Sequence, residues 1–471
     1  MSATLATRIA EDFAAAAYAN NDLQRQRAML AITERGLPTS RDENWKYVNL
    51  RPLEKVRFAP PAGEPRATVK AEDLPAPIAG YARYVFVDGV FAQGLSSTTV
   101  HPGVTVKSMR ADESLPTADG RAIGQRPLAA GTPPDCVLPP DLRFALLNEA
   151  FACDGARIQV EPGTDCRTCV ELVFVATAEA KAGASYPRVS FQVGARARVG
   201  LIERHVSIGS DANFVNSAVD VEVARDALVQ HYRVQQTGAR AIWFDTLTAR
   251  LAENAKYQLY SVNLGGLSAR STVHVKLTGE GSEVGFFGVS VGGKNQVHDT
   301  YALVEHIAPN ARTDQSFRGI SAGRARVAFN GKIIVRNGAH GTDSRQSLRG
   351  LLAGTDAEID VRPQLEIYTD DVRCSHGATA GKLDDNMLFY LLSRGLDRET
   401  AQRLLKWAFL EDVVAKIEVP ELRRQIELNL AGQLNDTAAL KGAPYTAHGQ
   451  WLEQLPRTDG ERAVPAQKVV L

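Results

Sequence analysis

The sequence contains few cysteines and no excess of charge of either sign. Its 471 residues include five cysteines, and 54 Lys and Arg balance 54 Asp and Glu. An odd and sparse set of cysteines does not suit a disulfide framework. The balanced charge argues against a dedicated nucleic-acid-binding protein, because such proteins usually carry a basic excess.

Long apolar runs and targeting signals are also missing. No run approaches the roughly 20 apolar residues that span a bilayer. The first residues, MSATLA, lack the basic segment and the following apolar segment of a secretory signal. The sequence therefore predicts a cytoplasmic protein with no membrane insertion and no nucleic-acid partner.

The P-loop motif, GxxxxGK followed by Ser or Thr, does not occur in the sequence, so we expect no ATP binding by that route. The glycine-rich segment 285–293 also lacks the strand-to-helix context of a dinucleotide-binding loop. What is present is an ordinary globular composition, 44% hydrophobic and 23% charged. The chain is long enough for one large domain or for two to three ordinary ones.

Composition divides the chain into five regions. Residues 1–55 are expected to be helical, because 9–35 is rich in good helix formers and is followed by Gly36 and Pro38. The proline-rich segment 56–155 predicts a connector with loops and short elements, such as a strand at 84–87. A β-rich body follows at 156–380, then a helical domain at 381–432 and a polar tail at 433–471.

The β-rich body consists of short apolar and β-branched runs between Gly, Asn, Asp and Ala turns. Turn spacings of about 8 to 12 residues are typical of an all-β fold. A sandwich of this length would normally divide into two domains, and no linker is visible. We therefore favour a solenoid, in which each turn buries its inward side chains on the next, although no repeat period can be fixed by inspection. The clearest strand segments are 170–175, 199–203, 217–223, 273–277 and 332–335.

Capping residues mark the C-terminal helices. Asp384 and Asp397 suit the N-caps of two helices, and Gly395 suits the C′ position of the first. A third helix is expected between Pro420 and Gly432. Apolar residues at i, i+3, i+4 and i+7 predict the buried face of the second helix: Ala401, Leu404, Leu405 and Ala408.

The cysteine pair and the histidines have simple structural explanations. Cys166 and Cys169 form a C-x-x-C, but in a β-rich stretch and without a second pair of metal ligands, so a structural role is expected. Several of the nine histidines lie in strand-like runs, where a satisfied polar group is the usual case. His298 and Asp299 are neighbours on a strand and therefore point to opposite faces, which excludes a catalytic dyad.

Two adjacent pairs of acidic residues leave an enzymatic alternative open. Asp370 with Asp371, and Asp384 with Asp385, are compatible with a β-solenoid carbohydrate-active enzyme, which needs paired carboxylates. Turn and helix-cap positions explain adjacent acids more simply. We favour the turn and cap roles.

Cys374 and His376 are two residues apart, so on an extended strand they share one face. A thiolate and an imidazole suit a soft metal such as iron or zinc. Two ligands make only half a site. The remaining ligands must come from elsewhere in the fold or from a partner chain.

The segment around these two residues, LEIYTDDVRCSHGAT at 365–379, closely resembles the C-terminal signature of the SufD family. These are the iron–sulfur cluster assembly proteins of the Suf system. The resemblance covers most of residues 40–430 and implies a right-handed parallel β-helix between helical ends. Further stretches match in order: ENWKY at 43–47, HDT at 298–300, HIAP at 306–309, FRG at 317–319, FNGKI at 329–333 and TD at 342–343.

The resemblance implies a non-catalytic scaffold subunit and not an enzyme. It implies a heterodimer with the paralogue SufB and attachment of the C-terminal helices to the ATPase SufC, in agreement with the missing P-loop. SufB carries Gln-Cys-Asp where this chain has Gln-Ser-Leu at 346–348, so the scaffold cysteine of SufB is absent here. No tightly bound cofactor is expected in the isolated chain, but a transient iron–sulfur cluster is expected at the interface with SufB.

The site residues implied by the resemblance fall in two places. His376 is the expected interfacial cluster ligand, with Cys374 as a weaker candidate. The alternative for His376 is a buried histidine that bonds across the dimer interface. On the second C-terminal helix, Trp407, Leu410 and Phe409 are the expected contacts of the ATPase, although Phe409 suits the core of the helical domain equally well.

Overall fold

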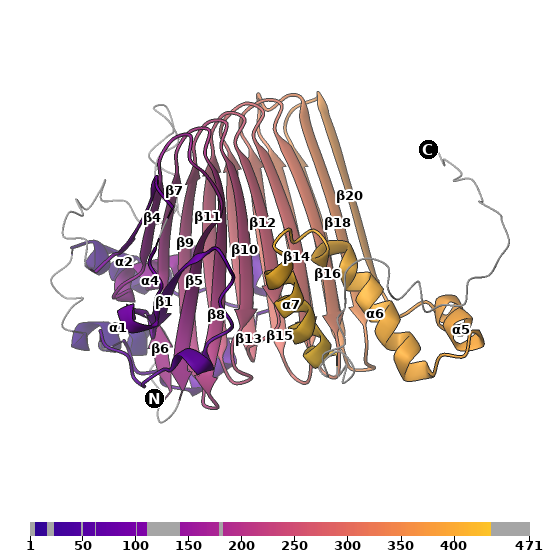
Figure 1. Ribbon diagram of the computed structural model, residues 1–471, viewed down its shortest axis with the longest axis horizontal. Coiled ribbons are helices and arrows are strands. Elements are labelled where there is room, and N and C mark those ends of the chain that lie inside the picture. The colour runs from indigo at the N-terminus through magenta and orange to yellow at the C-terminus, as the bar shows by residue number, and fades with distance from the viewer. Residues whose placement is uncertain are drawn as a thin grey trace.

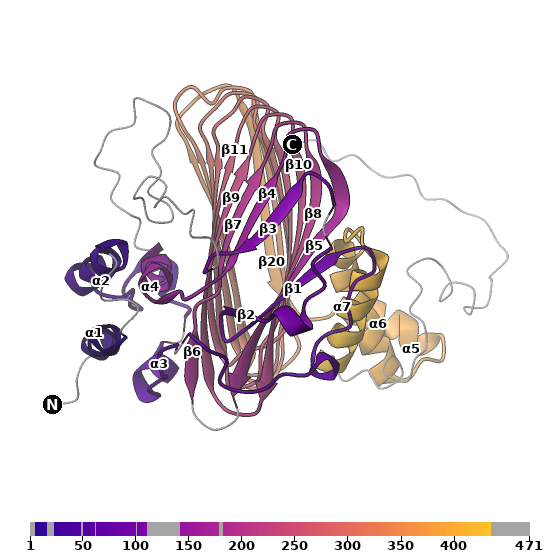
Figure 2. The ribbon, with the colours of Figure 1, turned by 60° about the vertical axis from the view of Figure 1, so that its left-hand side comes forward.

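The chain forms a parallel β-solenoid of about seven turns, flanked by helices on two opposite sides (Figures 1 and 2). The computed structural model describes residues 5–16, 23–48, 50–61, 63–99, 101–110, 142–178 and 182–434. The prediction of a solenoid is confirmed. The rejected sandwich shares one feature with it, because the solenoid is flattened into two sheets that face each other across one core.

Each turn of the solenoid contributes one strand to each sheet, and successive turns pair in parallel. Sheet 1 contains, in spatial order, β2 (Val90–Phe91), β1 (Ala82–Val87), β5 (Asp165–Ala178), β8 (Arg198–Gly209), β10 (Leu228–Gln236), β12 (Lys256–Asn263), β14 (Glu283–Gly292), β16 (Arg312–Ser321), β18 (Thr342–Leu352) and β20 (Val372–Gly381). Sheet 2 contains β19 (Glu358–Ile367), β17 (Arg326–Val335), β15 (Val297–His306), β13 (Ser268–Leu277), β11 (Ile242–Leu251), β9 (Asn213–Val223), β7 (Arg188–Val193), β4 (Ala156–Val160) and β3 (Val104–Ser108), with β6 (Gly183–Ser185) beside β9.

One turn of the solenoid takes 26 to 33 residues, as the pairs Ile242 with Ser268 and Ala156 with Val189 show. The turns stack on one another in a repeated conformation. Three turn residues, Asp226, Asn254 and Asn310, have positive φ angles of 58°, 53° and 57° respectively. Asn and Asp tolerate this left-handed region better than other residues with side chains.

The two ends of the solenoid differ. At the N-terminal end, the antiparallel strands β2 and β3 close sheet 1 and sheet 2 respectively. At the other end, β19 and β20 are the last strands of their sheets, and no further strand of the described chain pairs with them. Figure 1 shows β20 at this open end of the stack. The predicted connector therefore takes part in the solenoid, since β1 and β3 extend its sheets.

The N-terminal helices pack on the outer face of sheet 2, as Figure 2 shows on its left side. Trp45 stacks on Phe144 at 5.1 Å between ring centroids, and Phe144 meets Phe244 of β11 edge-on at 4.9 Å. The predicted helix at 9–35 is two helices, with 17–22 outside the described residues, and it ends at Gly36 as expected. The helices on this face are α1 (Leu5–Ala15), α2 (Leu23–Arg35), η1 (Glu43–Trp45), α3 (Arg51–Lys55) and α4 (Arg143–Phe151). The short helices η2 (Ala71–Asp73) and η3 (Gln93–Leu95) lie beside the outer face of sheet 1.

The C-terminal helices are α5 (Asp385–Ser393), α6 (Arg398–Val414) and α7 (Pro420–Gln433). Helices α6 and α7 cover the outer face of sheet 1 (Figure 2). The predicted N-caps are confirmed: the side chain of Asp384 accepts from the backbone N–H groups at the start of α5, and that of Asp397 accepts from Thr400. Gly395 has the expected positive φ, 91°. Helix α7 begins at Pro420 as predicted but continues one residue past Gly432.

The predicted buried face of α6 is wrong. Ala401 is buried, but Leu404 and Leu405 are only partly covered and Ala408 is exposed. The residues that meet sheet 1 are spaced three or four apart on another face: Trp407, Leu410, Val413 and Val414. The predicted residues and the observed ones both recur with helical spacing. Periodicity alone therefore could not show which of the two faces of α6 packs against the aromatic surface of sheet 1.

Candidate functional site at the open end of the solenoid

Cys374 and His376 lie on β20, the last strand of sheet 1. Their partners in register on β18 are Ser344 and Gln346, whose side chains are buried between the two sheets. Side chains in register on parallel strands point to the same face of a sheet. Cys374 and His376 therefore continue the inner face of the solenoid at the point where no further turn of residues 5–434, as far as the structure describes them, covers it.

The exposure of the two candidates differs. His376 is exposed, and Cys374 is half buried against the solenoid core. Apolar side chains form the rim beside them: Ile367 is 42% exposed and Tyr368 is 54% exposed. The open end thus presents core-type residues together with a thiol and an imidazole.

The ligand set at this end is incomplete within the chain. Within the described residues, no group of three or more His, Cys, Asp or Glu side chains is placed to hold a metal ion. Cys374 and His376 are the two soft donors that the sequence predicted to share a face, and the strand geometry brings them together as expected. An iron–sulfur cluster needs about four ligands, so further donors would have to come from another molecule.

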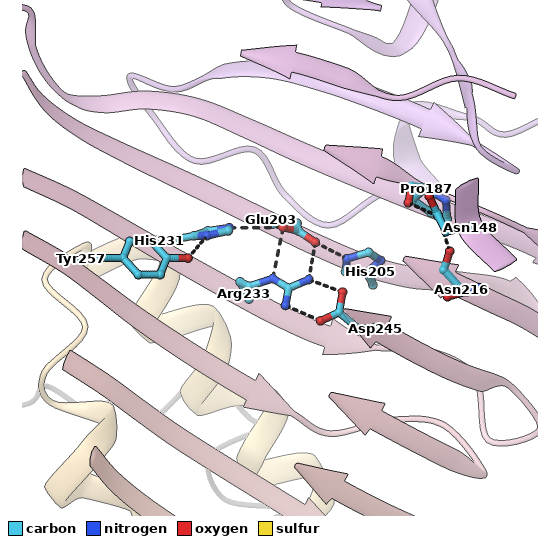
Figure 3. A network of polar contacts seen from close by, with 9 residues as sticks. All are labelled: Asn148, Pro187, Glu203, His205, Asn216, His231, Arg233, Asp245 and Tyr257. Atoms are coloured by element: carbon cyan, nitrogen blue, oxygen red, sulfur yellow. Dashed lines mark hydrogen bonds and ion pairs between the residues drawn. The ribbon is translucent and has the colours of Figure 1, made fainter. Parts of the chain in front are cut away.

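A second cluster of titratable side chains lies inside the solenoid (Figure 3). In sheet 1, four strands separate its strand β10 from β20. Its centre is Arg233 of β10, which donates two hydrogen bonds to Glu203 of β8 at 3.1 and 2.7 Å. The same guanidinium donates two hydrogen bonds to Asp245 of β11, at 2.6 and 2.7 Å. Nε2 of His205 and of His231 lies 2.6 and 3.2 Å from Glu203. Every one of these side chains is 5% exposed or less.

The charges of this network are fixed by their neighbours. Burial alone would raise the pKa of Glu203, but the charge of Arg233 and the hydrogen bonds from both histidines hold it well below its usual range. Burial disfavours the charged Arg233, yet Asp245 and Glu203 raise its pKa well above its usual value. Burial lowers the pKa of His231, more strongly than the adjacent Glu203 raises it. The network is a paired, sealed structure with no exposed group to offer a substrate.

Sequence reasoning missed this network. Its members come from three strands, with Glu203 and Asp245 respectively 30 and 12 residues from Arg233 in the sequence. Each one looks like an isolated polar residue within a strand. The only available signal was spacing. Glu203 and His205 are two residues apart, as are His231 and Arg233, so each pair lies on one face of its strand. Without the repeat period, the turns that bring the two pairs together could not be aligned.

The structure confirms the structural roles predicted for several other residues. Cys166 and Cys169 are buried in β5, and burial raises the pKa of both thiols, so neither is an activated nucleophile. His298 faces inward and contacts Ser290, whereas Asp299 faces outward and pairs with Arg270, so the two do not form a dyad. Cys136 lies outside the described residues.

The acidic pairs occupy cap and turn positions. Oδ1 of Asp384 accepts from the backbone N–H groups of Asn386 and Met387 at 2.8 and 3.0 Å. Asp370 and Asp371 lie in the exposed turn between β19 and β20. These positions fit the turn and cap roles that the sequence favoured over a carbohydrate-active site.

The expected partner residues on α6 lie mostly inside the chain. Trp407 is 8% exposed and Leu410 is fully buried, and both pack on the outer face of sheet 1. Phe409 is half buried. Burial leaves Trp407 and Leu410 without surface for a partner, because they hold α6 on the solenoid.

The exposed apolar surface of the helical region is on α5. Met387 is 59% exposed, Phe389 is 72% exposed and Tyr390 is 55% exposed. Figure 1 shows α5 at the far end of the C-terminal helices, away from the solenoid. The sequence signal that could have found this surface was the run of apolar residues at 387–392. These residues lie on all sides of helix α5, so those on the side away from α6 stay exposed.

None of the helices in the described part of the chain has the length and the apolar character needed to span a bilayer.

Comparison with known proteins agrees with this architecture. Residues 174–409 match the family described as SUF system FeS cluster assembly, SufBD core domain. The chain is 30% identical over 415 residues to the iron–sulfur cluster assembly protein SufD of Escherichia coli (strain K12), covering 87% of this chain and 92% of that protein. It is 27% identical over 415 residues to a SufBD family iron–sulfur cluster assembly protein of Synechocystis sp., covering 86% and 89% of the two chains. With its solenoid, its open last turn and these matches, the chain belongs to the SufBD family of iron–sulfur cluster assembly proteins.

Proposed function

We propose that this chain is the SufD-type scaffold subunit of a SufBCD-type complex, and that it is not itself an enzyme. Its open end would pair with a SufB-like paralogue, and a transient iron–sulfur cluster would form between the two chains. The observation that carries the proposal is what this end of the solenoid exposes. The outer edges of β19 and β20 pair with no other described strand, and Cys374 and His376 are two soft metal donors on β20.

The unpaired edges support a partner that is itself a β-sheet protein. An edge strand leaves its outer backbone N–H and C=O groups free, and a strand from another chain can pair with them. The exposed apolar rim at Ile367 and Tyr368 would be buried in such an interface. A second solenoid with an open end has the matching shape.

His376 is proposed as the principal cluster ligand of this chain. Its ring is exposed on the inner face, so it can reach a cluster that a partner chain also ligates. Cys374, which is half buried two residues away, is the weaker candidate. Neither tightly bound cofactor nor permanent metal is needed in the isolated chain, because the cluster is the cargo of the reaction.

A SufC-like ATPase is proposed to bind at the C-terminal helices. The exposed apolar residues of α5, above all Phe389, and the half-buried Phe409 form the surface for this contact. Trp407 and Leu410 contribute indirectly, since they fix α6 on sheet 1. The free thiols at Cys166, Cys169 and Cys374 fit a reducing compartment, which supports a cytoplasmic location.

Cluster formation on the assembled complex tests the ligand role. The tagged full chain is purified from its native host with its partners, and cluster formation from ferrous iron and sulfide is followed by absorbance. We expect His376→Ala to abolish cluster formation while the complex stays intact. His340→Ala, which removes another exposed histidine, is the matched control and should have no effect.

Two outcomes would overturn the proposal. If the tagged chain brings down neither a paralogous solenoid chain nor an ATPase, it is not a subunit of such a complex. If His376→Ala prevents assembly of the complex itself, His376 is an interface residue and not a cluster ligand. Phe389→Ala separates the two contacts, because it should release the ATPase and leave the pairing with the paralogue unchanged.

A further inference from the structure

Directly beneath His376 in the solenoid lies a stack of two glutamine side chains. Gln315 of β16, Gln346 of β18 and His376 of β20 are successive partners in register. Both glutamines are buried between the sheets, Gln315 completely and Gln346 to 4% exposure. Stacked amides on adjacent parallel strands form hydrogen-bonded ladders, with each amide bonding to the next along the stack.

The ladder has a defined direction. Nε2 of Gln346 donates one hydrogen bond to Oε1 of Gln315 at 2.8 Å and one to the backbone carbonyl of Gly331 at 3.0 Å. An amide NH₂ group has two hydrogens, so both are used. Both point back into the solenoid, which leaves the oxygen of Gln346 on the side of β20.

That oxygen is an unused acceptor. Oε1 of Gln346 is buried and has no hydrogen-bond partner in the part of the chain that the structure describes. A buried polar atom without a partner costs roughly 1 to 3 kcal/mol, so its neighbours are normally arranged to satisfy it. The next side chain along the ladder is His376, and an imidazole N–H is a suitable donor.

The surroundings are built around the two amides. A Cβ atom at Gly331 of β17 would lie 2.8 Å from Oε1 of Gln315 and 2.9 Å from Nε2 of Gln346. Any other residue at this position would push the ladder out of place. The glycine therefore leaves room for the amides and, through its carbonyl, helps to fix the direction of Gln346.

We propose that Gln346 is a positioning residue for His376, and that its side-chain oxygen accepts a hydrogen bond from one ring nitrogen of that histidine. This inference rests on the proposed role of His376 as a cluster ligand. The hydrogen bond would fix the tautomer and the plane of the ring, and it would leave the lone pair of the other nitrogen directed out of the open end. Histidines that bind metals usually donate their second ring nitrogen in this way, and loss of the acceptor typically costs 10- to 100-fold in affinity or activity.

A spectroscopic test needs no cluster. The full chain is labelled with ¹⁵N-histidine, and the ring signal of His376 is assigned from its loss in His376→Gln. An exposed imidazole N–H exchanges with water too fast to be seen, whereas one bonded to Gln346 gives a protected proton signal at neutral pH. We expect this signal in the unaltered chain, its loss in Gln346→Met, and its retention in Ser344→Ala.

Ser344→Ala is the matched control because it removes a buried hydroxyl from the same face of β18, two residues away and in register with Cys374. A general loosening of the open end would affect both variants. In the assembled complex supplied with ferrous iron and sulfide, we expect Gln346→Met to slow cluster formation about tenfold and Ser344→Ala to leave it unchanged.

The outcomes separate this inference from the proposed function. Absence of a protected ring proton in the unaltered chain, which requires no variant to fold, would overturn the role of Gln346. So would an unchanged signal in Gln346→Met. If His376→Ala abolishes cluster formation while Gln346→Met behaves like Ser344→Ala, the ligand role stands and the positioning role falls. If the signal depends on Gln346 but His376→Ala forms clusters normally, the hydrogen bond exists and the ligand role falls.

Discussion

The sealed network in the middle of the solenoid and the open end at β20 are built on the same inner face. One column of residues in register joins them: His231, Leu259, Phe286, Gln315, Gln346 and His376. The first histidine is fully buried and lies between Glu203 and the hydroxyl of Tyr257. The last histidine is exposed. Equivalent positions in the repeat thus carry the same side chain in opposite environments.

The difference shows how a solenoid separates stability from chemistry. In the middle, turns above and below supply partners for every charge, and the imidazole of His231 becomes part of the scaffold. At the end, the missing turn leaves the same kind of side chain free for a ligand. Leu259 and Phe286 lie between the two polar regions, so in this column an apolar block separates the stabilising charges from the open end.

The largest expected effect comes from breaking the sealed network at its centre. Arg233→Met would leave Glu203 and Asp245 buried without a cation, and we expect a loss of about 4 kcal/mol in the free energy of unfolding. Chemical denaturation followed by circular dichroism measures this loss. Arg225→Met removes an exposed arginine that pairs with Asp226, and it should cost less than about 1 kcal/mol. Equal losses in both variants would show that the network is not sealed.

The C-terminal helices offer the same contrast between a buried and an exposed aromatic residue. Trp407 is packed between α6 and sheet 1, so we expect Trp407→Ala to cost about 3 kcal/mol of unfolding free energy. Phe389 of α5 is 72% exposed, and Phe389→Ala should change stability by less than about 0.5 kcal/mol. Thermal denaturation of the two variants compares them. A large loss for Phe389→Ala would mean that α5 packs against the rest of the chain in solution.

The sealed interior also predicts sensitivity to acid. Burial lowers the pKa of His298 to about 4 and that of His306 to about 4, whereas an unfolded histidine titrates near 6.5. Between these values the unfolded chain binds protons that the folded chain does not. The stabilisation is therefore complete above pH 6.5 and is lost as the pH falls toward 4, with about 2 kcal/mol lost per ring at pH 5.

His298→Gln tests this dependence. The variant should lose about 2 kcal/mol less than the unaltered chain when the pH is lowered from 7.5 to 5, as measured by denaturation at both pH values. His340→Gln, which changes an exposed histidine, is the matched control. If His298→Gln retains the full acid sensitivity, His298 is already protonated or solvated in the folded chain.

The sequence predicted what depends on neighbouring residues. The strands around 170–175 and 332–335, the caps at Asp384 and Asp397 and the helix stops at Gly36 and Gly395 are all as expected, because each follows from local alternation or from a backbone requirement of one residue. The shared face of Cys374 and His376 follows from strand geometry in the same way.

What depends on distant residues was not predictable. The repeat period stayed hidden because equivalent turn positions accept several residue types, Arg196, Asp226 and Asn254 among them, so no single letter recurs. The ion network needs that period, since it joins Glu203 to Arg233 across adjacent turns. The buried face of α6 depends on the aromatic surface of sheet 1, which helical periodicity does not reveal. That the β-rich body ends near 380 was predictable, because the helical pattern that begins at Asp384 is a local signal.

The smallest expected effect lies at the open end, and it is the sharpest test of the comparison. His376→Ala removes an exposed side chain from a strand with one neighbour, and water that enters at the open end can replace the ring as the partner of Gln346, so the free energy of unfolding should change by less than about 0.5 kcal/mol. His231→Ala, the same substitution in the same register column, leaves Glu203 and Tyr257 each without one partner and should cost about 2 kcal/mol. Chemical denaturation of the isolated full chain compares the two variants directly. Similar losses would mean that the interior at β20 is closed in solution, and an imidazole held there for stability would not be free to bind a cluster.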